Sequence, residues 1–388
     1  MSSIHPLALE QTARPATTTA PAATDLTSAD FRFVFHANPE RFFQSPHRPL
    51  RVIHTPPAVE TYAGALYKPA TRGWYPFDGC LYDSERRRVE ASCLRRWRHD
   101  MAMNSEPATY DNPPADMPTY DRPLLYLGFL HPAYGHFLLE VMSYWWLLAE
   151  RAGDFDRFLV HLHDPKVLDK AHIKACLAAL GIDREQIVAF DRPTRLRSVT
   201  VPSPSVQLNS HIHDRYRAFV QQLAVALGAE KAQPTDQPLF VSRSGLAFGK
   251  DRYRGEERIE AYLEQKGVRV IHPQKIPFVE QVQIFNAHRR ILGTIGSGMH
   301  NIVLSLNAKT MTYFTAHGIN DNYFLVDKCF EADSTFVNAC QRSDRARVLL
   351  GNLKKGILGK RHRNDGFLIT HDLDVPRVIR WLESSADL

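Results

Sequence analysis

The strongest constraint on the fold of this chain is an alternation of short apolar runs with longer amphipathic runs, which occurs in two successive series along the 388 residues. In the first series we expect strands at 124–127, 158–162, 186–190 and 198–201, with helices at about 135–149 and 167–180. Strands that alternate with helices are typical of a parallel sheet covered by helices. The first series therefore predicts an α/β fold.

The second series follows a predicted helix at 216–227 and a polar run at 231–238, which is the expected hinge. Its expected strands span 237–242, 268–271, 290–294 and 310–314, with helices at about 256–266, 278–287 and 298–306. Two such series predict two Rossmann-like domains that face each other across a cleft, with ligand at the carboxyl ends of the strands.

The segments outside the two series have different compositions. Residues 1–30 are rich in Ala, Thr and Pro, which predicts a disordered tail. Short apolar runs separated by turn residues make the segment from about 31 to 120 β-rich. A last helix at about 374–384 is expected to pack back on the first domain. The predicted organisation is a tail at 1–30, domains at 31–210 and 211–371, and a returning helix at 372–388.

Charge and cysteine content narrow the class of protein. The net charge of +6 comes from 48 basic and 42 acidic residues spread along the chain, which suits a phosphate-bearing substrate or an anionic membrane surface. No RRM, KH or zinc-finger pattern supports a nucleic-acid partner. The five cysteines are widely spaced and include no Cys-x-x-Cys pair, so we expect five free thiols and no zinc site.

We expect a cytoplasmic protein. The chain has no run of about 18 apolar residues and no secretory signal pattern at its start. Basic runs at 86–98 and 354–363 are interpreted as solvated charged faces, and peripheral association with the inner face of a membrane is the functional alternative.

A glycine turn between a predicted strand and a predicted helix is the clearest candidate for a binding site. The turn and the helix start contain Gly296, Ser297, Gly298, Met299, His300 and Asn301. Backbone N–H groups at such a helix start attract an anion. The alternative is that the glycines only permit a tight turn. A dehydrogenase fingerprint fits less well, because Asn301 stands where the third glycine would be.

Three charged residues of the second series are further candidates. Arg243 closes a predicted strand and Arg252 follows a loop, and arginine suits phosphate oxygens. Glu280 opens a predicted helix, where its carboxylate could accept ribose hydroxyls. The alternatives are a solvated surface for the arginines and a favourable helix-dipole charge for Glu280.

In the first series, His136 and Glu140 are the candidate catalytic pair. Their spacing puts them one helical turn apart on one face. A histidine oriented by a carboxylate could serve as a general base for an acceptor hydroxyl. The alternative is a buried histidine that is satisfied by a local hydrogen bond.

Taken together, these motifs resemble glycosyltransferase family 61, a group that includes bacterial capsule-type transferases, over roughly 50–315. The run at 135–137, the sequence at 241–243, Glu280 with Gln281, and the run at 296–301 carry the resemblance. The chain departs from the family pattern at 254–256, which leaves open whether Arg252 or Arg254 is the second phosphate ligand. It departs again at Ser297 and His300.

The resemblance implies a GT-B fold, a nucleotide-sugar donor in the second domain, and an inverting transfer without a metal or other cofactor. The expected function moves a sugar, from a donor expected to be UDP-linked, to a hydroxyl of a glycan or lipid-linked glycan in bacterial surface polysaccharide synthesis. The alternatives are a nucleotide-sugar epimerase and a non-catalytic protein that binds nucleotide sugars or polysaccharide.

Overall fold

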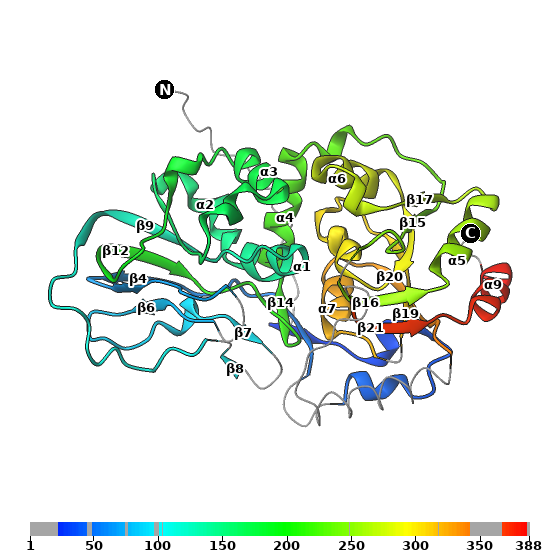
Figure 1. Ribbon diagram of the computed structural model, residues 1–388, viewed down its shortest axis with the longest axis horizontal. Coiled ribbons are helices and arrows are strands. Elements are labelled where there is room, and N and C mark those ends of the chain that lie inside the picture. The colour runs from blue at the N-terminus through cyan, green and yellow to red at the C-terminus, as the bar shows by residue number, and fades with distance from the viewer. Residues whose placement is uncertain are drawn as a thin grey trace, which may run out of the picture. The chain divides into compact units, whose positions relative to one another are not determined.

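The computed structural model describes residues 22–44, 49–73, 77–96, 101–102, 104–247, 249–316, 318–341 and 367–385. The chain forms two compact units. The first unit contains Met1–Leu26 and Ser45–Leu227, and the second contains Thr27–Gln44 and Gly228–Leu388. Each unit has a sheet with helices on it (Figure 1), so the predicted α/β fold class is confirmed.

The main sheet of the first unit has the strand order β11-β10-β9-β12-β5-β6, with β4 also paired to β12. Its strands are β4 (Val59–Ala63), β5 (Leu66–Lys68), β6 (Cys80–Tyr82), β9 (Thr119–Phe129), β10 (Phe158–His161), β11 (Ile187–Val188) and β12 (Thr194–Pro202). Strands β9 to β12 are mutually parallel, while β4, β5 and β6 are antiparallel to their neighbours. After β9 the chain adds β10 and β11 on one side and then places β12 on the other. The order therefore reverses between β9 and β12.

Helical segments connect these strands. Between β9 and β10 lie α1 (Tyr134–His136), the π-helix η4 (Phe137–Val141), the 3-10 helix η5 (Met142–Leu147), α2 (Leu148–Arg151) and η6 (Ala152–Asp154). Then come η7 (Pro165–Asp169), α3 (Ala171–Ala179), η8 (Arg184–Gln186) and α4 (Asp214–Ala226). The expected helices at 135–149 and 167–180 are thus present, in more irregular form.

The β-rich character expected for 31–120 is also confirmed. A small sheet in the order β1-β3-β14-β13 joins β1 (Ala23–Asp25), β3 (Arg51–Ile53), β13 (Val206–Gln207) and β14 (His211–His213). A further pair consists of β7 (Arg95–Arg96) and β8 (Met101–Ala102), and η3 spans Glu90–Ser92.

The second unit contains a fully parallel six-stranded sheet in the order β17-β15-β18-β19-β20-β2. Its strands are β2 (Arg32–Val34), β15 (Leu239–Val241), β17 (Arg269–Ile271), β18 (Arg290–Thr294), β19 (Thr310–Thr315) and β20 (Asp333–Asn338). The chain moves from β15 to β17 on one side and then to β18 on the other side of β15. The order therefore reverses between β15 and β18.

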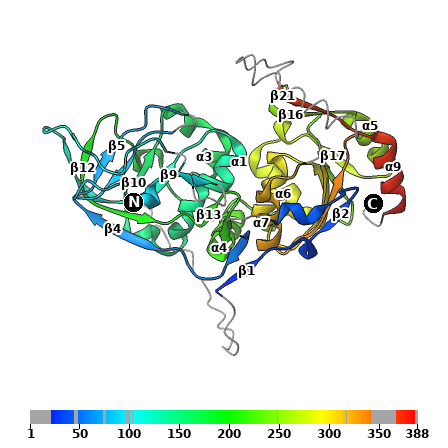
Figure 2. The ribbon, with the colours of Figure 1, turned by 90° about the horizontal axis from the view of Figure 1, so that it is seen from below.

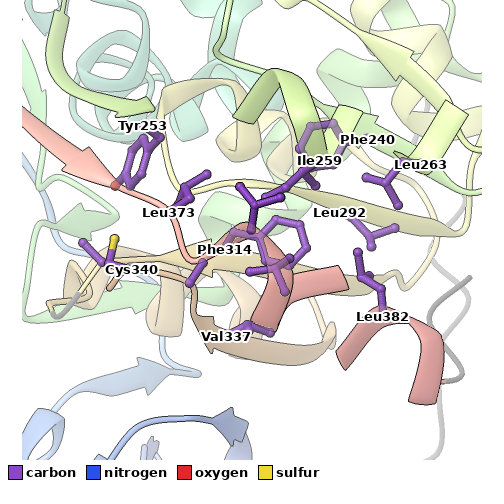
Figure 3. Close-up of a cluster of buried hydrophobic side chains, with 14 of the residues drawn as sticks. Phe240, Tyr253, Ile259, Leu263, Leu292, Phe314, Val337, Cys340, Leu373 and Leu382 are labelled. Atoms are coloured by element: carbon purple, nitrogen blue, oxygen red, sulfur yellow. The ribbon is translucent and has the colours of Figure 1, made fainter. Parts of the chain in front are cut away.

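The helices of the second unit are α5 (Glu256–Gln265), α6 (Phe278–Ala287), the 3-10 helix η11 (Ser297–Leu304), α7 (Asp321–Cys329) and α9 (Val375–Ser384). Shorter 3-10 turns are η1 (Ser28–Asp30), η2 (Pro39–Phe42), η9 (Ala229–Lys231) and η10 (Pro273–Lys275). A separate parallel ribbon pairs β16 (Gly249–Arg254) with β21 (Phe367–Asp372). Figure 3 shows how Tyr253 of the ribbon, Phe240 of β15 and Phe314 of β19 share one apolar core.

The position of the last helix corrects a prediction. We expected it on the first domain, but Val378 and Leu382 of α9 lie in the core of the second unit with Leu263 of α5. Figures 1 and 2 both draw α9 beside α5. The helix packs here because β21, which immediately precedes it, is already paired with β16.

Two domain boundaries are also corrected. Residues 27–44 belong to the second unit rather than to the first domain, because β2 pairs with β20 and Lys328 forms an ion pair with Asp30. The second boundary falls after Leu227 instead of at 210/211, because α4 packs in the first unit, where the Tyr216 hydroxyl donates to the Leu138 carbonyl.

The predicted tail is only partly testable. Residues 1–21 lie outside the described part of the chain, but 22–30 are ordered as β1 and η1, and Leu26 is buried. The prediction of a disordered tail is therefore wrong for 22–30. The basic run at 354–363 lies outside the described residues, and so does the end of the run at 86–98.

Two other expectations concern the whole chain. All five cysteines are free and buried, as predicted. Among the helices that the structure describes, none is both long and apolar enough to cross a membrane.

Candidate functional site

The carboxyl ends of β15 and β18 bring two of the predicted site elements into contact. The two strands pair in parallel, with Val241 opposite Gly293, so the chain leaves both at the same edge of the sheet. Arg243 follows β15 and Gly296 follows β18. A Cβ at position 296 would lie 1.7 Å from Nη1 of Arg243, although the extended φ of 172° would suit any residue. The guanidinium therefore occupies the space that a side chain at 296 would take, and such a side chain would displace it.

The Arg243 guanidinium is held, but its charge is not matched by a close carboxylate. Nη2 donates to the Asp251 carbonyl at 3.0 Å, and the group lies 6.0 Å from the centroid of the Tyr253 ring. Within the described ranges, its buried Nε has no hydrogen-bond partner and no ion pair to Arg243 is found. A positioned, half-buried cation with unused hydrogen-bonding capacity suits an anionic ligand.

The glycine turn supplies backbone donors beside this cation. The Met299 N–H donates to the Gly296 carbonyl at 3.0 Å, which starts the first turn of η11. The N–H groups of Ser297 and Gly298 precede that turn, and neither has a partner in the part of the chain that the structure describes. Such donors suit an anion, and the predicted anion-binding role of the turn stays a prediction.

The side chains that follow the turn are used for packing. Met299 fits against Gly293, where a Cβ would lie 2.5 Å from its sulfur. Asn301 is fully buried, and its Nδ2 donates to Oε1 of Gln281 at 3.0 Å. The His300 ring stacks on Tyr323 with 4.4 Å between the centroids. Of the six residues predicted here, Gly296 provides space, Ser297 and Gly298 present N–H groups, and Met299, His300 and Asn301 hold η11 in place.

The other two predicted donor-binding residues, Arg252 and Glu280, are both exposed. Arg252 is exposed on β16, on the face opposite the buried Tyr253. Its alternative, Arg254, pairs with the Asp372 carboxylate at 2.5 Å. Glu280 is exposed in the first turn of α6. Both of these predicted roles in donor binding remain proposals.

Glu256, which opens α5 after Gly255, was not among the predicted site residues. Its side chain is 1% exposed, and Oε1 accepts the Arg243 N–H at 3.2 Å. Burial raises the pKa of Glu256 to about 7, although the hydrogen bond from the Arg243 N–H and the Arg243 charge act to lower it. The one local signal is Gly255, whose φ of 95° marks a forced turn into the helix.

Tyr323 of α7 was also missed. Burial raises its pKa, while the Arg243 charge and a hydrogen bond from the Gly296 backbone favour the ionised form. Its edge meets Tyr313 of β19 at a centroid distance of 5.3 Å. Tyr323 therefore forms one wall of the Arg243 site, and no local pattern in the sequence indicates this.

In the first unit, the reversal between β9 and β12 is the corresponding place, and the predicted catalytic pair lies just beyond β9. His136 ends α1, and its Nδ1 lies 2.5 Å from Oε2 of Glu140 in the π-helix η4. The His136 side chain is 37% exposed and the Glu140 side chain 3%. A buried carboxylate thus orients a partly exposed imidazole. π-helical turns such as η4 are frequent at functional sites.

A second histidine stands beside this pair. The ring of the buried His131 lies 4.6 Å from the His136 ring, and its Nδ1 accepts the Ala133 N–H at 3.0 Å. That bond places the proton of neutral His131 on Nε2. His131 was not predicted, because a histidine before Pro132 has no helical neighbour with which to form a pattern.

We found no group of three or more His, Cys, Asp or Glu side chains with metal-binding geometry among the described residues.

Residues 134–312 match the family model described as Glycosyltransferase 61. The match begins at the helix that carries His136 and contains the whole segment from Arg243 to Asn301. No curated protein matches the chain.

Proposed function

We propose that this chain, which belongs to glycosyltransferase family 61 through residues 134–312, transfers a sugar from a nucleotide-sugar donor to a hydroxyl of a glycan acceptor. The observation that carries the proposal is the Arg243 guanidinium held against Gly296 at the strand-order reversal of the second unit. In open α/β sheets, ligands bind at the carboxyl ends of the strands where the order reverses.

The second unit is proposed to hold the diphosphate of the donor. As the bond from the anomeric carbon to the diphosphate oxygen breaks, negative charge grows on the leaving group. Arg243 and the N–H groups of Ser297 and Gly298 would meet that charge, and they are positioned before the reaction begins. The proposed transfer needs no metal, because a guanidinium and a helix start replace it.

The first unit is proposed to supply the base. The Glu140 carboxylate can only accept a hydrogen bond when ionised, so Nδ1 of His136 carries the proton and Nε2 is the basic atom of the neutral ring. Nε2 would take the proton of the acceptor hydroxyl as its oxygen attacks the anomeric carbon from the side opposite the diphosphate. This attack inverts the configuration. A GT-B arrangement of the two units would bring base and donor together.

The finer assignments are proposals that the family and the chemistry of the chain favour. They are a UDP-linked donor, a glycan or lipid-linked glycan acceptor in bacterial surface polysaccharide synthesis, and a cytoplasmic location with peripheral membrane contact. A release assay tests the activity. UDP release that depends on acceptor supports transfer, isomerisation of the donor supports an epimerase, and binding without turnover supports a non-catalytic protein.

Calorimetry with UDP and GDP tests the binding site. Arg243→Ala should weaken nucleotide binding at least about tenfold, because charge-assisted hydrogen bonds worth roughly 1.5–3 kcal/mol are lost. Arg258→Ala is the matched control, since Arg258 is exposed on α5. Unchanged nucleotide affinity in a folded Arg243→Ala variant would show that Arg243 does not bind the diphosphate.

A further inference from the structure

Glu256 lies directly behind the proposed diphosphate site. Its carboxylate is buried and accepts the Arg243 N–H just beyond the carboxyl end of β15. It therefore ties the start of α5 to the end of β15, beside which a ligand would bind. The contact also fixes the backbone of the residue whose guanidinium is the main cation of the site.

The charges around Glu256 are unbalanced. Arg243, from the loop after β15, and Glu260, one turn further along α5, are the charged groups that face it. Glu260 itself accepts the Ser242 hydroxyl and lies 3.8 Å from Nε2 of His272. Glu256 thus faces one guanidinium and one further carboxylate, and an anion that pairs with Arg243 would leave Glu256 with less compensating charge.

We propose that Glu256 is a positioning residue that couples the binding of a nucleotide-sugar diphosphate at Arg243 to the uptake of a proton by its own carboxylate. This inference rests on the proposed function. It goes further, because it names a group that never touches the ligand and yet makes donor binding depend on pH.

The direction of the coupling follows from electrostatics. With a pKa of about 7, Glu256 is largely ionised in the free protein above neutral pH. A diphosphate brought to Arg243 adds negative charge nearby, which raises this pKa further and draws a proton onto the carboxylate. Binding and protonation favour each other equally, so affinity is highest below pH 7 and falls as the pH rises. A rise of about one pKa unit on binding corresponds to about a tenfold change in affinity.

Two variants separate the proton uptake of Glu256 from its hydrogen bond with the Arg243 N–H. Glu256→Gln keeps an oxygen that can accept the Arg243 N–H but removes the ionisable group. Glu256→Ala removes the acceptor and leaves a buried N–H without a partner, which should weaken binding at least about fivefold at every pH. Glu257→Gln is the matched control, because Glu257 is the next residue of the same helical turn and is exposed.

The experiment is calorimetry of the full chain with UDP-glucose and GDP-mannose, whose diphosphates do not titrate near neutral pH. Titrations at pH 7.5 in two buffers of different ionisation enthalpy measure the protons taken up, and titrations from pH 6 to 8.5 measure the affinity. The wild type and Glu257→Gln should take up a fraction of a proton and bind about tenfold more weakly at pH 8.5 than at pH 6. Glu256→Gln should take up none and bind equally across this range.

Equal proton uptake in the wild type and Glu256→Gln, or none in either, would overturn the inference while leaving the proposed function intact. If neither nucleotide sugar binds to the wild type, the proposed function fails, and the inference that rests on it fails as well.

Discussion

The carboxyl ends of β9 and β12 in the first unit and of β15 and β18 in the second are equivalent places, because the strand order reverses at both. Their chemistry is opposite. The second unit presents a guanidinium, a glycine and backbone N–H groups, whereas the first presents an imidazole held by a buried carboxylate. The same topology thus creates one site suited to stabilising negative charge and another suited to moving a proton.

This difference shows which features the fold determines and which it does not. A strand-order reversal leaves an opening at the sheet edge, so the location of both sites follows from the order of connections. The residues of the segments that follow β9, β15 and β18 decide the chemistry. We therefore expect substitutions at the two places to act on different steps, with the larger effect on turnover in the first unit and the larger effect on nucleotide affinity in the second.

The largest effect is expected at the first unit. His136→Ala should lower turnover roughly 10²- to 10⁴-fold through loss of the base, while nucleotide affinity holds. Glu140→Gln should cost less, because the amide can still orient the ring. Steady-state kinetics together with calorimetry separate the two quantities, with His163→Ala as an exposed histidine control in the same unit. Near-normal turnover in His136→Ala would place the base elsewhere.

The two units should also respond to pH in opposite ways. Burial lowers the pKa of His161 in the first unit to about 4, so its contribution to stability is present above pH 6.5 and is lost as the pH falls towards 4. The shift from 6.5 corresponds to about 3 kcal/mol. Burial raises the pKa of Asp327 in the second unit to about 7, so its contribution is present below about pH 4 and is lost as the pH rises through 7.

Hydrogen exchange read by mass spectrometry can follow each unit separately between pH 4 and pH 8. The first unit should exchange relatively faster at the acidic end, and Asp327→Asn should reduce the alkaline loss of protection from the second unit, to which Glu256 also contributes because burial raises its pKa to about 7. A second unit whose protection is indifferent to Asp327→Asn would contradict the assignment.

A smaller effect is expected at Gly296. Gly296→Ala would place a methyl group in the space of the guanidinium, so it should displace Arg243 and weaken nucleotide binding about tenfold or more, much as Arg243→Ala does. The double variant should be little worse than either single one, because both disturb the same contact. Gly318→Ala is the control in the same unit, since nothing lies within 4 Å of a Cβ there. Losses of nucleotide affinity that add up in the double variant would show that Gly296 and Arg243 act independently.

Arg252→Ala should weaken nucleotide binding only about twofold or less, because surface charges contribute little. A loss as large as that of Arg243→Ala in the same calorimetric experiment would restore Arg252 as a second phosphate ligand.

Chelation is expected to have no effect. Turnover should survive EDTA in the release assay, because the proposed site meets the leaving charge with Arg243 and backbone N–H groups. Activity that is lost on chelation and restored by magnesium or manganese would show that a metal handles the leaving group.

The sequence predicted the elements that local patterns determine. The helices α5 and α6 and the strands β18 and β19 lie where periodicity placed them, and Arg243 and the glycine turn both follow strands as expected. Their direct contact could not be predicted, because it depends on β15 and β18 being neighbours in the sheet. Glu256 and Tyr323 were missed for the same reason. Each joins the site through packing between elements that are distant in sequence.

The wrong predictions for residues 22–30 and for the last helix have a related cause. Residues 22–30 are too polar to fold by themselves, but β1 is ordered because it pairs with β3. Likewise α9 has an apolar face that periodicity detects, while the surface that covers this face is decided by the pairing of β21 with β16. Hydrophobic periodicity thus shows which face of a helix is buried, but it does not show which element covers that face.

The placement of β2 has a consequence for the synthesis of the chain. The polypeptide passes between the units after Leu26, after Gln44 and after Leu227, so the second unit takes its first strand from a segment made long before the rest. β2 can pair with β20 only after β20 has been synthesised. Pairing between segments so distant in sequence slows folding. A fragment that starts at Gly228 would lack β2 and expose the edge of β20, which invites aggregation. The second unit is therefore a poor candidate for expression by itself, and a ribosome must release nearly the whole chain before its sheet is complete.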